Sequence, residues 1–138
     1  MDSSQAACVL LVEDNPGDVG LVEEALTEHR VKGELVVLGD GEKAIQFVEE
    51  LEAKTGPYPE LVILDLNLPK RTGTEVLRRI RESALWNHVP VVILTSSNSP
   101  QDRQETARLG ANLYIRKPGG LAEFLEIGAV LKTFLMQQ

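Results

Sequence analysis

The sequence contains one cysteine, Cys8, among its 138 residues. A disulfide within the chain needs two cysteines, so this bond and any cysteine-rich metal site are excluded. No apolar run approaches the roughly 18 residues that a membrane-spanning helix needs. The first five residues also lack the basic and then apolar order of a secretory signal peptide. These absences predict a protein of the cytoplasm, in which Cys8 serves as a small core residue.

Acidic residues outnumber basic ones, and the formal net charge is −7. This charge argues against non-specific binding of nucleic acid, because the phosphate backbone attracts basic surfaces. Residues 1–65 hold 15 acidic and 4 basic side chains, whereas residues 66–138 hold 6 acidic and 10 basic ones. The asymmetry fits ordinary solvated helix faces, and the alternative is two surfaces that meet different partners.

The chain length predicts one domain over residues 1–138, with its core between about residues 7 and 136. Short runs of Val, Ile and Leu, typical of strands buried on both faces, alternate five times with segments of helical spacing. The predicted strands are 9–12, 34–38, 61–65, 91–95 and 112–116. The predicted helices are one that opens at Asn15–Pro16, 41–54, one capped by Thr74, 100–109 and 121–136.

This alternation predicts an α/β fold of the doubly wound (βα)5 type, which is the flavodoxin-like architecture. Right-handed crossovers place helices on both faces of a five-stranded parallel sheet. The predicted strand order is 2-1-3-4-5, with a switch point between the first and third strands. Ligands of such sheets bind outside the carboxyl ends of the strands.

Chemically matched polar residues stand at the carboxyl ends of four predicted strands. Glu13 and Asp14 follow the first strand, and Asp65 ends the third. Thr95 ends the fourth strand, and Lys117 follows the fifth. An acidic pair after a strand is often only a helix N-terminus. The joint occurrence of three carboxylates, a hydroxyl and an ammonium at one sheet edge instead favours a functional site.

The predicted chemistry of this edge is phosphoryl transfer. Carboxylates in one crevice repel each other, and a hard divalent cation relieves the repulsion. Oxygen ligands favour Mg²⁺, held by Glu13, Asp14, Asp65 and the backbone carbonyl of Asn67. Thr95 and Lys117 carry donors suited to phosphate oxygens. Asp65, at the end of the central strand, is the predicted nucleophile.

These residues resemble the signature of the response-regulator receiver domain of two-component signalling, over essentially the full length of the chain. The resemblance implies that Asp65 takes phosphate, with Mg²⁺, from a phosphohistidine on a sensor histidine kinase or a phosphotransfer protein. It implies no enzymatic activity beyond the protein's own phosphorylation and dephosphorylation. It also implies a cis peptide bond between Lys117 and Pro118. The motifs that carry it are Glu13–Asp14, Asp65 with Leu68–Pro69 and Gly73, Thr95–Ser96 and Lys117–Pro118.

Two loops, residues 11–18 and 65–70, are similar to those of stand-alone receivers, several of which serve phytochrome-type kinases. The sequence departs from the commonest family pattern at two places. Glu13 replaces one of two aspartates, and its longer arm still reaches a metal. Gly119–Gly120 stand where an apolar residue often packs, which predicts a looser entry into the last helix. No DNA-binding module follows Gln138, so any output is expected to pass through a protein contact.

The resemblance also assigns a signalling role to Thr95 and Tyr114. Thr95 would move toward the phosphate, and the Tyr114 ring would enter the space that it leaves. Taken from the residues alone, the alternative is that Tyr114 is an edge-strand residue with its hydroxyl in solvent. Asn67 and Ser97 flank the path of a hydrolytic water, and we expect them to set the lifetime of the phosphate.

The last predicted helix has a wide apolar face. It belongs either to a thoroughly buried helix or to one that serves both the core and a partner. Segment 100–109 is short and polar, so it is expected to shift at little cost. The fourth helix, fifth strand and last helix would then form a surface for a homodimer or a downstream protein. The apolar face consists of a core stripe of Leu121, Phe124, Leu125 and Leu131 and a second stripe of Ile127, Val130 and Phe134.

Other functions use the same residue types. An aspartyl-phosphate phosphatase also combines an Asp nucleophile with Mg²⁺, but such enzymes carry Asp-x-Asp after the first strand and a substrate-covering cap. A docking scaffold without a switch is another alternative, and the intact site argues against it. A flavin site fails at the first loop, because Glu13–Asp14 would repel the flavin phosphate.

Overall fold

The computed structural model describes residues 7–136. Five parallel strands form one sheet in the order β2-β1-β3-β4-β5, which confirms the predicted flavodoxin-like fold. The strands are β1 (Ala7–Val12), β2 (Gly33–Leu38), β3 (Leu61–Leu64), β4 (Val91–Thr95) and β5 (Leu113–Arg116). The helices are α1 (Pro16–Glu28), α2 (Gly41–Lys54), α3 (Gly73–Glu82), α4 (Pro100–Arg108) and α5 (Leu121–Met136). No helix among these is long and apolar enough to span a membrane.

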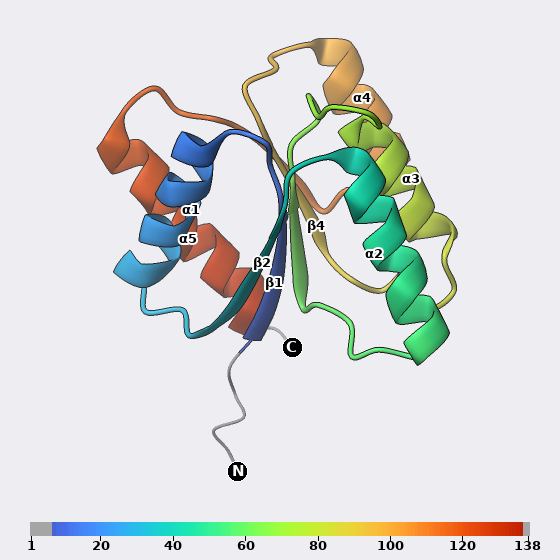
Figure 1. The fold of residues 1–138 in the computed structure, drawn as a ribbon. Helices are drawn as coiled ribbons and strands as arrows, with labels where there is room; N and C mark the ends of the chain where they lie inside the picture. Colours follow the sequence, from blue (N-terminus) through green and yellow to red (C-terminus); the bar gives the residue numbers. More distant parts are fainter. Residues whose placement is uncertain (1–6, 137–138) are drawn as a thin grey trace.

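The helices cover both faces of the sheet in two layers (Figure 1). α1 and α5 lie side by side on one face, and α2, α3 and α4 cover the other. The strand residues alternate between these layers, as the period of two requires. Leu10, Val62 and Ile93 pack toward α2 and α3, whereas Leu11 and Ile63 pack toward α1 and α5. Because both faces are buried, the central strands are continuous apolar runs.

α3 begins two residues earlier than the sequence prediction. Thr72, not Thr74, caps the helix, because the Thr72 side chain accepts a hydrogen bond from the Glu75 amide at 3.2 Å. The Glu75 carboxylate in turn accepts from the Thr72 amide at 2.9 Å. This reciprocal pair is a capping box, and it satisfies two helix N–H groups at once. Thr74 cannot form the same pair, because no acidic residue stands three positions after it.

The prediction of a cis peptide bond between Lys117 and Pro118 is wrong. Within residues 7–136, the cis bond lies instead between Gly56 and Pro57. Bonds before proline favour trans by about 0.5–1 kcal/mol unless the chain path requires cis.

The apolar residues of α5 that are buried differ from those that the predicted stripes placed in the core. Phe124, Ile127 and Leu131 are buried against α1 and the sheet. Leu121, which was expected in the core, is 58% exposed, and Val130 is 37% exposed. Leu121 stands at the first position of the helix.

α1 and α5 approach each other closely at Gly128. A methyl group built on Gly128 would overlap the carbonyl oxygen of Ala25 and the ring of His29. His29 is also hydrogen-bonded, with its Nε2 lying 3.0 Å from the backbone oxygen of Leu125. Glycine at position 128 therefore sets the distance between the two helices that carry this side of the core.

We expect Gly128→Ala to lower the free energy of unfolding by about 1–3 kcal/mol, because the helices must separate to admit the methyl group. The loss should exceed the gain of about 1 kcal/mol that alanine gives a helix interior. Gly20→Ala in α1 is the matched control, since no atom lies within 4 Å of its added Cβ. Urea unfolding checks both variants, and equal stabilisation of both would contradict the close packing.

Candidate functional site

The sheet register brings the polar strand ends together. β1 and β3 are adjacent, and Val12 pairs with Leu64, so Glu13 and Asp65 follow paired residues. The backbone extends the ladder beyond them, since the Asp65 amide donates to Val12 O at 3.1 Å. On the other side of the site, the Lys117 amide donates to Thr95 O at 2.7 Å. The carboxyl edge is therefore a continuation of the sheet.

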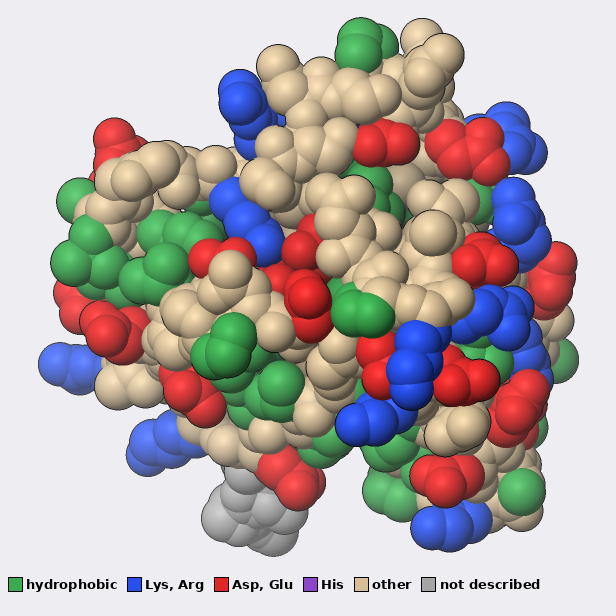
Figure 2. Space-filling model, turned by 45° about the horizontal axis from the view of Figure 1, so that its top comes forward, with side chains coloured by type: hydrophobic (Ala, Val, Ile, Leu, Met, Phe, Trp, Pro, Cys, Tyr) green, Lys and Arg blue, Asp and Glu red, His purple; other side chains and the backbone are tan. Residues whose placement is uncertain are grey.

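Three carboxylates cluster at this edge. Ligand oxygens of Glu13, Asp14 and Asp65 all lie within 4.8 Å of one another. Glu13 and Asp65 are buried, while Asp14 is exposed to solvent. Figure 2 shows this edge from outside, with acidic side chains gathered in a hollow beside a basic one. The hard oxygen donors and the negative charge suit a divalent cation such as Mg²⁺, with one open side for water or substrate oxygens.

Lys117 supplies the counter-charge. Its Nζ lies 2.8 Å from Glu13 Oε1, 3.1 Å from Asp65 Oδ2 and 2.7 Å from Asp18 Oδ2. An ammonium has three N–H donors, and each finds a carboxylate here. The sequence interpretation did not include Asp18. Its signal was weak, one acidic residue in the first turn of a helix, where such residues are common.

The electrostatics follow from burial and from these contacts. Burial raises the pKa of the Glu13 carboxyl, the hydrogen bond from Lys117 opposes the rise, and the charge of Asp65 adds to it. For Lys117, burial lowers the pKa, but hydrogen bonds to Asp18 and Glu13 and the charge of Asp65 outweigh this effect, so the pKa is raised. Lys117 therefore remains a cation at physiological pH.

The loop after β3 wraps closely around Asp65. The Asn67 amide donates to Asp65 Oδ1 at 3.3 Å, and the side chain of Asn67 is exposed. Gly73 lies against the Asp65 backbone, where any side chain would overlap the Asp65 carbonyl oxygen. The backbone carbonyl of Asn67 as a metal ligand stays a prediction.

Thr95 and Tyr114 meet at Ser97. Thr95 is fully buried, and its Oγ1 accepts a long hydrogen bond of 3.4 Å from the Ser97 amide. The Tyr114 hydroxyl donates to the Ser97 carbonyl at 3.0 Å, so it is not directed into solvent. The alternative of a solvated edge tyrosine therefore does not describe this structure. Ser97 links the end of β4 to β5.

The same loop is tied to α4. The Ser97 hydroxyl donates to Asp102 Oδ2 at 2.5 Å, and Ser99 caps the helix through the Asp102 amide. The guanidinium of Arg103 lies 4.4 Å from the centroid of the Tyr114 ring, a cation–π contact. The first turn of α4 is therefore in direct contact with both Ser97 and Tyr114.

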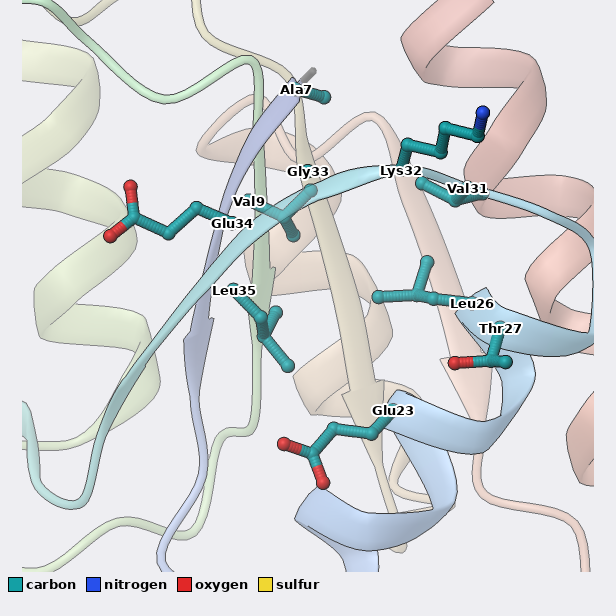
Figure 3. A pocket seen from close by; sticks show the side chains of 10 residues that line it. All are labelled: Ala7, Val9, Glu23, Leu26, Thr27, Val31, Lys32, Gly33, Glu34 and Leu35. Carbon is teal, nitrogen blue, oxygen red and sulfur yellow. The ribbon is translucent and has the colours of Figure 1, made fainter.

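A separate cavity of about 290 Å³ lies between α1 and the start of β2 (Figure 3). Its floor is aliphatic, with Val9, Leu26 and Leu35, and Glu23 and Thr27 stand on its α1 wall. The cavity is at the amino ends of β1 and β2, so it is at the end of the sheet opposite to the acidic cluster. It brings none of the predicted site residues together.

We expect Lys117→Met to lower the free energy of unfolding by about 3 kcal/mol in metal-free buffer, since Glu13 and Asp65 would lose their counter-charge. Added Mg²⁺ should recover much of this loss, because a cation can replace the ammonium. Lys43→Met, at an exposed site in α2, is the control and should respond to neither change. Urea unfolding with EDTA or Mg²⁺ measures both effects. Equal Mg²⁺ responses in wild type and Lys117→Met would contradict the assignment.

Comparison with known proteins places this site in a family. The family model described as the response regulator receiver domain matches residues 9–128. Response regulator Rcp1 of Synechocystis sp. is 34% identical over 99% of this chain and 93% of its own length. Among solved structures, the phosphorylated cyanobacterial phytochrome response regulator RcpA has a TM-score of 0.86 at 34% identity, covering 95% of this chain and 94% of that one.

A second solved structure bears on the acidic cluster. The Mn²⁺-bound form of response regulator Rcp1 has a TM-score of 0.83 at 36% identity, with 93% of each chain covered. The bacteriophytochrome response regulator AtBRR is also similar, at 36% identity and a TM-score of 0.74, over 95% of this chain and 93% of that one. The fold, the acidic cluster and these matches together show that the chain belongs to the response regulator receiver domain family and closely resembles phytochrome response regulators.

Proposed function

We propose that Asp65 is the phosphoacceptor and receives its phosphoryl group from a phosphohistidine of a sensor histidine kinase or a phosphotransfer protein. The observation that carries the proposal is the position of Asp65. Its carboxylate is buried, shares a cluster within 4.8 Å with Glu13 and Asp14, and contacts Lys117 at 3.1 Å. A carboxylate between a cation site and an ammonium is placed to accept a negatively charged group.

The transfer balances with the residues present. An oxygen of Asp65 forms a bond to phosphorus while the P–N bond of the phosphohistidine breaks, and the imidazole leaves with the electron pair. Glu13, Asp14, Asp65 and the carbonyl of Asn67 would hold Mg²⁺, which when bound supplies neutralisation of the phosphoryl oxygens. Lys117 and the Thr95 hydroxyl donate to the same oxygens. The protein itself positions and stabilises, and catalyses no reaction of a separate substrate.

The proposed switch runs from Thr95 to the first turn of α4. Phosphorylation adds about 1.5–2 negative charges and new acceptor oxygens at Asp65. Thr95 turns its hydroxyl toward them, and its contact with the Ser97 amide, already long at 3.4 Å, is released. Tyr114 and α4 are bonded to the same loop and adjust with it. Asn67 and Ser97 border Asp65 and Thr95, so they set how readily water reaches the phosphoryl group.

The proposed output surface comprises α4, β5 and α5. Leu113, Leu121 and Val130 are large apolar side chains that these elements leave exposed. Exposed apolar groups on neighbouring elements favour a second copy of the chain or a downstream protein as partner. Similarity to the phytochrome response regulators supports a phytochrome-type kinase as the source of the phosphoryl group.

Incubation with acetyl phosphate and Mg²⁺ is expected to add one phosphoryl group, seen by intact-mass spectrometry. Asp65→Asn should show no adduct, because the amide is a poor nucleophile. EDTA should suppress the adduct in wild type. An adduct that persists in Asp65→Asn would place the acceptor elsewhere. Rapid turnover of phosphate esters without any adduct would favour the phosphatase alternative.

The switch predicts that beryllofluoride, a phosphoryl mimic, with Mg²⁺ slows amide hydrogen exchange in the loop of residues 96–99 by several-fold. New acceptor oxygens at Asp65 order the donors around them. Exchange in α2 should stay unchanged, because the hydrogen bonds of Ser97 and Tyr114 lead to α4 and not to α2. Asp65→Asn supplies the control protein. Unaltered exchange in both segments, together with an unaltered elution volume in sizing chromatography, would contradict a phosphorylation-linked surface.

A further inference from the structure

Asp18 forms an ion pair with Lys117, and the proposed phosphoryl transfer gives Asp18 no role. Its Oδ2 lies 2.7 Å from Lys117 Nζ, which is shorter than the contacts of Lys117 with Glu13 at 2.8 Å and Asp65 at 3.1 Å. A hydrogen bond between an ammonium and a carboxylate is about twice as strong as one between neutral groups. Asp18 is therefore a direct ion-pair partner of Lys117, alongside Glu13 and Asp65.

Asp18 differs from those two carboxylates in one respect. Glu13 and Asp65 belong to the metal-binding cluster, whereas Asp18 does not. The oxygens of Glu13 and Asp65 would thus contact two cations, the metal and the ammonium. Asp18 is the partner of Lys117 for which no metal competes.

The position of Asp18 is fixed by its helix. The Asn15 side chain caps α1 and accepts from the Asp18 amide at 3.1 Å, and Pro16 begins the helix with a restricted backbone. α1 is in turn packed closely on α5 at Gly128. The Asp18 carboxylate is therefore attached to the capped first turn of α1.

An ion pair of this kind has one of two effects. It either draws Lys117 away from Asp65, or it fixes the ammonium at a distance from which it reaches Asp65. The structure favours the second, because Lys117 contacts Asp18 at 2.7 Å and Asp65 at 3.1 Å at the same time. The contact with Asp18 leaves the ammonium within hydrogen-bond range of the proposed phosphoacceptor.

We propose that Asp18 is a positioning residue that anchors the Lys117 ammonium so that it meets the phosphoryl group arriving on Asp65. The inference rests on the proposed function of Asp65. With acetyl phosphate as donor, an Asp65 oxygen bonds to phosphorus while the bond from phosphorus to the acetate oxygen breaks, and acetate leaves with the electron pair. Asp18 takes no part in these bonds and acts only through Lys117.

The test compares wild type, Asp18→Asn and Glu24→Gln with increasing acetyl phosphate at saturating Mg²⁺. Glu24→Gln removes the same charge from an exposed site on α1 and is the matched control. If Asp18 anchors Lys117, Asp18→Asn lowers the maximal phosphorylation rate about tenfold, as expected for a displaced catalytic group, and leaves half-saturation nearly unchanged. Glu24→Gln keeps the wild-type maximal rate. An unchanged or faster maximal rate in Asp18→Asn overturns the proposal.

Calorimetric titration with Mg²⁺ separates positioning from metal binding. Asp18→Asn should bind Mg²⁺ within about threefold of wild type, whereas Asp14→Asn should bind at least about tenfold more weakly. If Asp18→Asn loses Mg²⁺ affinity as severely as Asp14→Asn, Asp18 acts on the metal and the proposal is overturned.

A third measurement does not depend on phosphorylation. In metal-free protein, NMR of the Lys117 ammonium should show protons that exchange with water several-fold faster in Asp18→Asn than in wild type. Equal exchange in the two proteins overturns the anchoring role. If wild type takes no phosphoryl group, the proposed function fails, and the NMR comparison still decides whether Asp18 holds Lys117.

Discussion

The contact of one ammonium with three carboxylates holds the acidic edge of this receiver domain together. Glu13 and Asp65 are buried side by side, and two carboxylates at this distance repel each other unless a cation lies between them. Lys117 is that cation in the chain itself, and it satisfies one oxygen of each carboxylate. Lys117 therefore fixes the relative positions of Glu13 and Asp65 through contacts within the chain, as electrostatic stabilisation by a preorganised site requires.

The rest of the structure positions the acidic edge and connects it to α4. Parallel strands with buried faces bring residues 13, 65, 95 and 117 to one edge, and backbone hydrogen bonds beyond the strands keep them there. From Thr95 a short chain of contacts leads through Ser97 to Tyr114 and to the first turn of α4. Thr106 is the residue that α4 buries, so few packing contacts hold this helix in place, and the proposed switch uses an element of low local stability.

Much of this was predictable from local patterns. Apolar runs of four residues identified the strands, and right-handed crossovers reduced the possible strand orders to a few. The resemblance to receiver domains, which are a standard example of the doubly wound fold, pointed to the order 2-1-3-4-5 among them. The Asn15 cap of α1 was also predicted correctly. The cap of α3 was predicted wrongly, although Thr72 followed three residues later by Glu75 is itself a local capping-box pattern. The exposure of Leu121 depended on how α5 packs in the tertiary structure, which no helical period reports.

The sequence by itself determined the fold, the carboxylates at the strand ends and the residue types suited to a metal and a phosphate. These follow from periodicity and from the fixed polarity of a parallel sheet, which are local properties. Only the tertiary structure decided that Asp18 shares Lys117, from 99 residues away, and that the Tyr114 hydroxyl bonds to Ser97. It also decided that the Lys117–Pro118 bond is not cis. Such contacts depend on how a helix is rotated on the sheet and which rotamers the packed neighbours permit, and neither is encoded in a short stretch of chain.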